Sequence, residues 1–174
     1  MRMKRRRRSV SFWNHWIPLL CWMTVIFLMS AQPHEKQDLK PWLQNSKAEQ
    51  VVKERFSGVQ LNYGGKEISV HKNGAAAFME FFIRKLAHIM EYMVLGFLVF
   101  RLSARIIHRK AKVHMVLSLL FCGIYAGLDE MHQIYTAGRT PMISDVILDT
   151  CGAAFGIMTY YLCKQMIERS GDTV

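Results

Sequence analysis

Long apolar stretches occur four times along the chain. The first, from Trp16 to Ala31, reads WIPLLCWMTVIFLMSA, and the others cover Ala75–Phe100, Val113–Tyr135 and Pro141–Cys163. Because a helix crosses the hydrocarbon core of a bilayer with about 20 residues, the pattern predicts an all-α integral membrane protein with four transmembrane helices. A soluble helical bundle is the alternative for the last three stretches, since the first half of the 75–100 stretch carries several charges.

The first apolar stretch lies in a segment without Asp, Glu, Lys or Arg that runs from Ser9 to Pro33. Tryptophans at positions 13, 16 and 22 suit a membrane interface. A cleaved signal peptide also has a basic start and an apolar run, but here the run is longer and lacks a clear small-x-small cleavage site. We therefore expect a transmembrane helix over residues 12–31.

Basic residues indicate the orientation. Of the 23 Lys and Arg residues, six lie in the first eight positions, five in the 101–112 connection and two after Cys163. An excess of Lys and Arg in short loops marks the cytoplasmic side, so both termini are expected in the cytoplasm. The predicted divisions are a basic cytoplasmic tail (1–11), transmembrane helix 1 (12–31), an extracellular insertion (32–74), a three-helix core (75–163) and a cytoplasmic tail (164–174).

The net charge of +10 would ordinarily suggest nucleic acid as a partner. The bases are concentrated beside the predicted spans, where they attract membrane lipids, so no nucleic acid is expected. The four cysteines, at positions 21, 122, 151 and 163, all lie inside predicted spans. They are expected to be packing residues and not disulfide partners.

The 32–74 insertion has its own local signals. Ser46 and Glu49 form a capping box, which predicts a short helix that stops near Gly58. The following Gly64-Gly65 pair predicts a two-residue hairpin in which Leu61 faces Ile68 and Val59 faces Val70. A helix plus a hairpin could form a small lid, and a plain structural connector is the alternative.

Ionisable residues recur on one face of the predicted helices. From Glu80 they are spaced by 4, 4 and 3 residues, and Asp145 and Asp149 are four apart. At about 1.5 Å of rise per residue, these groups and the 129–133 run fall in the outer third of the bilayer. Such groups are costly in lipid unless they face one another or water, so we expect an outward-facing polar pocket. The candidate ligand-binding residues are Arg84, Lys85, His88, Glu91, Tyr92, Asp129, Glu130, His132, Gln133, Arg139, Asp145 and Asp149.

Two pairs of glycines have the four-residue spacing that is typical of close helix packing in membranes. These candidate packing residues are Gly123 with Gly127 and Gly152 with Gly156. The polar residues have a structural interpretation too, as a network that only holds the helices together. A functional pocket is favoured because assembly alone needs fewer charged groups.

The chemistry of the pocket is open from the residues alone. Arg84, Lys85 and Arg139 suit a phosphate or carboxylate. Histidines 88 and 132 with acids 129 and 130 could ligate a divalent metal or act as acid and base. No established metal motif, nucleotide loop or nucleophile elbow occurs, so no cofactor or resident metal is expected, and an enzyme is not favoured.

The motifs resemble the VanZ-like family of bacterial membrane proteins. The resemblance rests on the run from Arg84 to Gly96, the Asp129-Glu130-Met131-His132-Gln133 run, Arg139, Asp145 and Gly152, and it covers about residues 75–160. Ala137 stands where many relatives have a proline, and Asp149 where many have asparagine.

The resemblance implies a multi-pass protein of the plasma membrane of a Gram-positive bacterium, with a role in the cell envelope. The family's founding member is an accessory protein linked to antibiotic resistance against teicoplanin. The leading hypothesis is that the pocket engages a lipid-linked, peptidoglycan-related or lipoglycopeptide ligand. The alternatives are a membrane-embedded hydrolase or transferase that acts on a lipid phosphate, and a small lipid transporter.

Overall fold

The computed structural model describes residues 12–32, 38–107, 110–137 and 142–171, and most of these are helical. The predicted basic tail over residues 1–11 and the turn that carries Arg139 lie outside the described residues. The elements are α1 (Phe12–Ser30), α2 (Lys40–Leu43), α3 (Lys47–Phe56), β1 (Gln60–Tyr63), β2 (Lys66–Ser69), α4 (Val70–Asn73), α5 (Ala75–Ile106), α6 (Ala111–Ala137) and α7 (Ile143–Gly171).

Three helices of the described chain, α5, α6 and α7, are long and apolar enough to cross a membrane. The chain is therefore a mostly helical, multi-pass membrane protein. A helix also forms at the position predicted for the first span. This helix, α1, has 19 residues that include Asn14, His15 and Pro18, so length and composition alone do not establish a fourth span.

The long helices continue past the predicted spans. Helix α5 ends at Ile106 and not at Phe100, and α7 continues to Gly171 and not only to Cys163. Lys and Arg residues end an apolar run, but they are good helix formers and do not end a helix. At about 1.5 Å per residue, the 32 residues of α5 extend over roughly 48 Å, well beyond a hydrocarbon core of roughly 30 Å.

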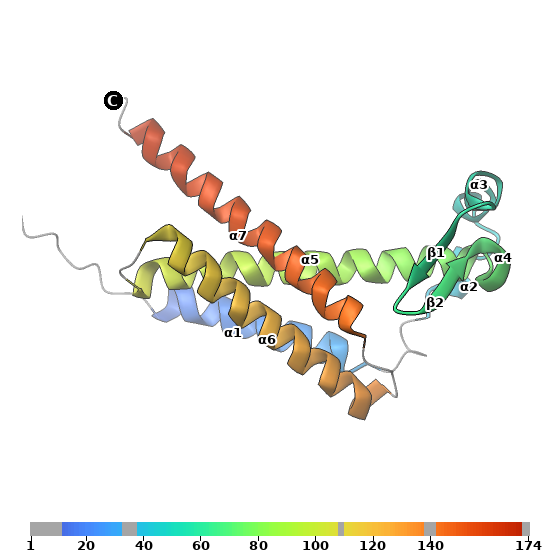
Figure 1. The fold of residues 1–174 in the computed structure, drawn as a ribbon, viewed down its shortest axis with the longest axis horizontal. Coiled ribbons are helices and arrows are strands. Elements are labelled where there is room, and N and C mark those ends of the chain that lie inside the picture. The colour runs from blue at the N-terminus through green and yellow to red at the C-terminus, as the bar shows by residue number, and fades with distance from the viewer. Residues whose placement is uncertain (1–11, 33–37, 108–109, 138–141, 172–174) are drawn as a thin grey trace, which may run out of the picture.

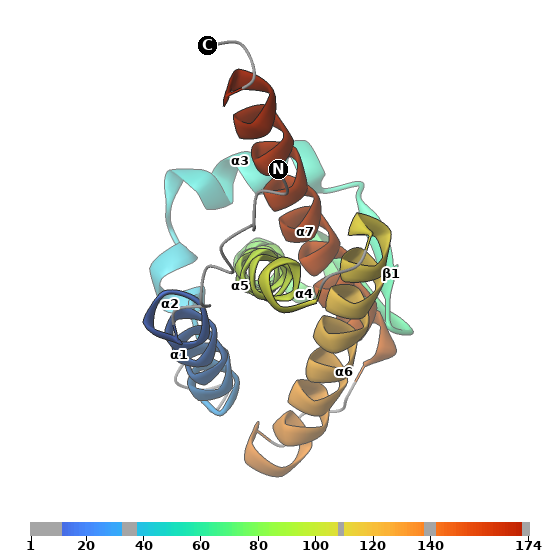
Figure 2. The same ribbon diagram turned by 90° about the vertical axis from the view of Figure 1, so that its left-hand side faces the viewer.

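Helix α5 is the centre of the bundle. Figure 2 looks along α5 and shows α1 on one side of it, with α6 and α7 on the other. In Figure 1, α7 crosses α5, and the short elements from α2 to α4 gather at the N-terminal end of α5. We call that end of the bundle the insertion end. The opposite end, formed by residues 97–107, 110–112 and 160–171, is called the basic end.

Glycines bring α5 and α7 together at the crossing. A Cβ atom on Gly152 would lie 2.6 Å from the carbonyl oxygen of Ile89, and one on Gly156 or Gly96 would overlap the backbone of the facing helix. The two backbones are therefore in direct contact, which a larger side chain at these positions would prevent. Around this crossing, all four long helices contribute to a buried apolar cluster: Leu19, Ile26, Tyr92, Leu95, Val99, Leu102, Cys122, Ala126 and Ala153.

The glycines of α6 have looser surroundings. A Cβ atom on Gly123 would make an ordinary contact of 3.5 Å with the side chain of Thr150, and one on Gly127 would meet no atom within 4 Å. Close backbone approach is therefore a property of the α5 and α7 pair, and α6 packs on α7 through side chains.

Helix α3 forms where its capping box predicts it. The hydroxyl of Ser46 accepts a hydrogen bond of 3.1 Å from the backbone N–H of Glu49. The carboxylate of Glu49 in turn accepts the backbone N–H of Asn45 at 2.7 Å, one residue before the cap. The Ser46 bond is that of a capping box, while the Glu49 side chain reaches the N–H one residue earlier than in the standard motif, and together the two bonds satisfy the start of the helix.

The predicted hairpin is also confirmed. Strands β1 and β2 are antiparallel and pair Leu61 with Ile68 across a turn at Gly64 and Gly65, both with positive φ. The predicted pairing of Val59 with Val70 lies beyond the ladder, because Val70 begins α4. Two short helices, α2 and α4, are additional to the prediction.

Candidate functional site

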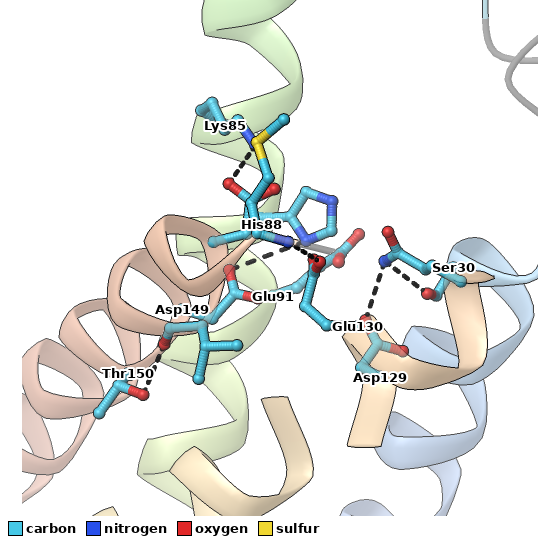
Figure 3. Close-up of polar contacts among 12 residues, drawn as sticks. Ser30, Lys85, His88, Glu91, Asp129, Glu130, Asp149 and Thr150 are labelled. Carbon is cyan, nitrogen blue, oxygen red and sulfur yellow. Dashed lines mark hydrogen bonds and ion pairs between the residues drawn. The ribbon is translucent and has the colours of Figure 1, made fainter. Parts of the chain in front are cut away.

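Polar side chains from α5, α6 and α7 meet at the insertion end of the bundle. Figure 3 shows Lys85, His88 and Glu91 of α5 between Asp149 of α7 on one side and Glu130 of α6 on the other. The three helices therefore bring most of the predicted set into one region. Within this region the residues form several separate contacts.

Asp145 joins the hairpin to two helices. Its Oδ1 atom accepts hydrogen bonds of 2.5 Å from the Lys85 ammonium and of 2.5 Å from the Tyr63 hydroxyl. The Lys85 ammonium also lies 4.8 Å from the centroid of the Tyr63 ring. Burial and the bond to Asp145 raise the pKa of the Tyr63 phenol, so this hydroxyl stays a donor at neutral pH.

Arg84 pairs with a neighbour on its own helix. Its guanidinium lies 2.6 Å from the carboxylate of Glu80, one turn earlier, and Glu80 is only 3 % exposed. Adjacent helix positions point about 100° apart, since a turn has 3.6 residues, so Arg84 and Lys85 face different neighbours. Arg84 and Lys85 are adjacent in the sequence but therefore bind different partners.

His88 faces Asp149 across the contact between α5 and α7. The imidazole Nδ1 atom lies 3.8 Å from Oδ1 of Asp149. At this distance the two groups form an ion pair when the histidine is protonated. Asp149 is 1 % exposed, and Tyr92, one turn below His88, is fully buried. Among the described residues, the Tyr92 hydroxyl has no hydrogen-bond partner. Polar groups thus continue from the site into the interior of the bundle.

The acidic and amide groups of α6 connect helices. Glu130 accepts a 3.1 Å hydrogen bond from the backbone N–H of Met142, directly before α7. The Gln133 amide donates to the Ser30 hydroxyl of α1 at 2.8 Å and to Asp129 at 3.2 Å (Figure 3). Both hydrogen bonds of Gln133 are buried, so Gln133 and Asp129 have a structural role.

His132 lies apart from the other α6 candidates. Its ring stacks on Phe27 of α1, with 4.3 Å between the ring centroids and 15° between the planes. No group of three or more His, Cys, Asp or Glu side chains within the described ranges is arranged to hold a metal ion. A divalent metal shared by His88 and His132 therefore stays a prediction from the sequence.

A cavity of about 240 Å³ opens between α1 and α5. Of the candidates that the structure describes, Arg84, His88 and Glu91 line this cavity. The remaining lining residues are Met29, Ser30, Leu39, Ile83 and Ala87. Cationic, acidic and hydroxyl groups therefore share one small space with apolar side chains. We call it the amphiphilic cavity.

Sequence reasoning missed two residues of this region. Tyr63 lies in the insertion and reaches Asp145 across 82 positions of sequence, and Ser30 lies at the end of α1. Neither has a local signal, because each acts through a partner that only the folded bundle brings near. Tyr63 directly precedes the hairpin glycines, but that position alone does not indicate a contact with α7.

A family model described as VanZ/LLP1 matches residues 15–164. The chain belongs to the VanZ/LLP1 family. The match is longer than the 75–160 resemblance, so the family domain includes α1 and the insertion as well as the three long helices. Comparisons with curated proteins and with solved structures gave no match.

Proposed function

We propose that this VanZ/LLP1 protein is an accessory protein of the cell envelope that protects a Gram-positive bacterium against glycopeptides such as teicoplanin. In this proposal it binds an amphiphilic ligand, either a lipid-linked peptidoglycan precursor or a lipoglycopeptide, in the amphiphilic cavity at the outer face of the plasma membrane. The observation that carries the proposal is the meeting of Arg84, His88 and Glu91 with apolar side chains in that cavity.

The ligand chemistry follows from the two kinds of lining. An arginine fork suits phosphate or carboxylate, while His88, Glu91 and the Ser30 hydroxyl offer further polar contacts. Met29, Leu39 and Ile83 suit hydrocarbon. A cavity of about 240 Å³ suits the junction between a polar head and a chain, not a whole glycopeptide.

Lateral access supports a ligand that arrives from the bilayer. Ile83 is exposed, and so are Leu86 and Met90 on the same stretch of α5. Large exposed apolar residues on a membrane helix are expected to face lipid. An amphiphile held in the outer leaflet would then reach the cavity without leaving the membrane.

The orientation is part of the proposal, with α1 as a fourth span and both termini in the cytoplasm. The indole of Trp22 donates to the carbonyl of Glu91 at 2.9 Å, and the Tyr125 hydroxyl donates to the carbonyl of Met23 at 2.8 Å. The opposite face of α1 leaves Leu20 and Leu28 exposed. A helix bound to the bundle on one side and apolar on the other belongs in hydrocarbon.

Single cysteines test this orientation. In a variant without native cysteines, Trp42→Cys in the insertion should react with a membrane-impermeant maleimide on intact cells, because Trp42 is 84 % exposed. Lys112→Cys at the basic end should react only after the cells are permeabilised. The reverse pattern would contradict an outward-facing site.

The function is tested by growth in teicoplanin. Variants His88→Ala, Glu91→Gln and the double variant Glu80→Gln with Arg84→Gln change the cavity, and the double variant leaves no unpaired buried charge. We expect each to return susceptibility to that of cells lacking the protein while its abundance in the membrane stays the same. Lys112→Gln, far from the cavity, is the matched control and should retain protection. Full protection by all three cavity variants would refute the proposal.

The position of His88 favours one second candidate, a membrane-embedded hydrolase or transferase. A histidine that faces a buried carboxylate, as His88 faces Asp149, is an arrangement that can serve a general base. Incubation of purified protein with undecaprenyl-type phosphates separates the two candidates. Turnover that is lost in Asp149→Asn favours the enzyme, and binding without turnover favours the accessory protein.

A further inference from the structure

The two helices that cross at the glycines separate toward the basic end, as Figure 1 shows for α5 and α7. One turn after Gly156, the ring of Tyr160 packs edge-on against Phe97 and Phe100, with 5.0 Å and 5.6 Å between ring centroids. These rings fill the space directly beyond the crossing. Past them the helices diverge, and the space between them is a cavity.

The gap at the basic end holds two cavities, one on each side. The larger has a volume of about 560 Å³ and is lined by Phe97, Ala104 and Arg105 of α5 and by Tyr160, Lys164 and Ile167 of α7, among others. The smaller, about 310 Å³, includes the start of α6 and shares Ala104, Lys164 and the acid Glu168 with the larger. Ala104 has only a methyl group, so α5 leaves the space opposite Lys164 open.

Positive charge predominates at this end. Within the described residues 97–107, 110–112 and 160–171, one acid, Glu168, stands among several bases. Its ion pair with Lys164 is long, at 3.8 Å, and both side chains are about half exposed or more, so the pair neutralises little. The bases are Arg101, Arg105, Lys110, Lys112, Lys164 and Arg169.

The surroundings of the larger cavity are apolar. On α7, Leu162, Met166 and Ile167 are exposed, and so is Ile106 of α5. A cavity that carries a basic group and opens among exposed apolar side chains matches a molecule with an anionic head and a hydrocarbon chain. An inorganic anion or a cytosolic metabolite would leave the apolar part uncovered.

We propose that the larger cavity binds an anionic phospholipid of the cytoplasmic leaflet. The phosphate lies between Arg105 and Lys164, and one acyl chain lies against Phe97, Tyr160 and Ile167. Basic recesses between transmembrane helices on the cytoplasmic side are known to suit anionic head groups. The lipid fills the space between α5 and α7, which widens from the glycine crossing toward the basic end. This site lies at the opposite end of the bundle from the amphiphilic cavity. Its assignment to the cytoplasmic leaflet rests on the orientation given with the proposed function, whereas its binding of an anionic phospholipid does not depend on that function.

Lipid retention in detergent tests the site directly. Purified full-length protein is mixed with phosphatidylglycerol or with phosphatidylcholine of the same chains, and retained lipid is counted by native mass spectrometry. Wild-type protein should retain phosphatidylglycerol preferentially. The double variant Arg105→Gln with Lys164→Gln should retain it roughly 25-fold less tightly, from about a fivefold loss for each of the two basic contacts.

A matched double variant separates the site from general electrostatics. Lys112 and Arg169 are exposed bases of the same end that line neither cavity, so Lys112→Gln with Arg169→Gln removes the same charge elsewhere. It should retain phosphatidylglycerol as the wild type does. Equal losses in the two double variants, or equal retention of phosphatidylcholine by the wild type, would overturn the proposal.

Two further measurements identify the occupant. Ala104→Phe fills the gap without changing charge and should abolish retention, provided that circular dichroism shows a folded protein; unchanged retention in the folded variant would overturn the proposal. Soluble glycerol phosphate should not displace the lipid, and efficient displacement would assign the site to a free phosphate. A dimer that dissociates in the Arg105 and Lys164 variant, with lipid retention unchanged, would assign it to a second copy of the chain.

Discussion

The insertion end and the basic end of the bundle use charge differently. At the insertion end, bases and acids from different elements meet at 2.5 to 3.8 Å, as Lys85 does with Asp145 and His88 with Asp149. At the basic end, bases outnumber the acid Glu168 among the described residues, and the ion pair of Lys164 with Glu168 is long and exposed. Both ends belong to the same two helices, α5 and α7, so the helices themselves do not explain the difference.

The comparison separates charges that stabilise the fold, at the insertion end, from charges that are available to a binding partner, at the basic end. Buried charges of opposite sign satisfy each other and fix the positions of helices, at a cost if either is removed. A group of like charges beside lipid has no such internal partner and is instead available to anionic head groups. The following predictions test this division, beginning with the largest expected effect.

Removing Asp145 should damage the insertion end most. Asp145→Ala leaves the Lys85 ammonium without its carboxylate and the Tyr63 hydroxyl without its acceptor. We expect the free energy of unfolding in detergent to fall by about 3 kcal/mol, at the low end for buried pairs because each side chain keeps 19 % exposure. The double variant Lys85→Met with Asp145→Leu should recover most of this loss. At the basic end, Lys164→Ala should change stability by no more than about 0.5 kcal/mol.

The glycine crossing that separates the two ends should be the next most sensitive feature. Gly156→Ala forces a Cβ atom into the backbone of Met93, and we expect a loss of about 2 kcal/mol from overpacking. Gly127→Ala is the matched control, because a Cβ atom there meets no atom within 4 Å. It should be neutral or gain up to about 1 kcal/mol from helix propensity. Thermal unfolding of the two variants compares them, and equal losses would argue against a close α5 and α7 contact.

The hairpin contact should contribute less. Tyr63→Phe removes one hydrogen bond to Asp145 and keeps the Lys85 pair and the ring contact, so a loss of about 1 kcal/mol is expected. Amide hydrogen exchange should become faster in β1 and β2 while α6 stays unchanged. Unchanged exchange in the hairpin would mean that the bond does not hold it to the bundle.

The smallest expected effect is a pH-dependent change in the stability of α3, through the carboxyl of Glu49 at its start. Hydrogen bonds from Lys53 and from the backbone of Asn45 lower the pKa of Glu49 below its usual 4.5. A carboxyl with a lowered pKa stabilises the fold above its ordinary pKa and loses that contribution as the pH falls through the folded value. Pepsin cleavage within residues 47–56 should therefore rise between pH 5 and about pH 3, relative to Glu49→Gln at each pH. A constant ratio would contradict this expectation.

Local signals made part of the fold predictable from sequence. The capping box at Ser46 and the Gly64-Gly65 turn depend on residues within a few positions of one another, and both form as expected. The existence of the long helices followed from apolar runs. Their ends did not, because Arg101 and Lys164 end the apolar pattern while the helix continues through them.

The candidate site was predictable as a region but not as a set of contacts. Helical spacing predicted that the acids and bases of three helices lie at the same end of the bundle. It did not predict that Arg84 pairs with Glu80 while Lys85 turns to α7, since that depends on which neighbours surround α5. The contact of Tyr63 with Asp145 depends on how the hairpin packs, for which the sequence has no local signal.

The most direct test of the amphiphilic cavity is a photo-crosslinker placed at Ala87, which lines it, compared with one at Leu86, which is 60 % exposed on the neighbouring face of α5. In growing cells, the probe at Ala87 should capture a cell-wall lipid precursor or, in treated cells, the lipoglycopeptide, while the probe at Leu86 captures bulk phospholipid. Capture of the same phospholipids at both positions would contradict the account.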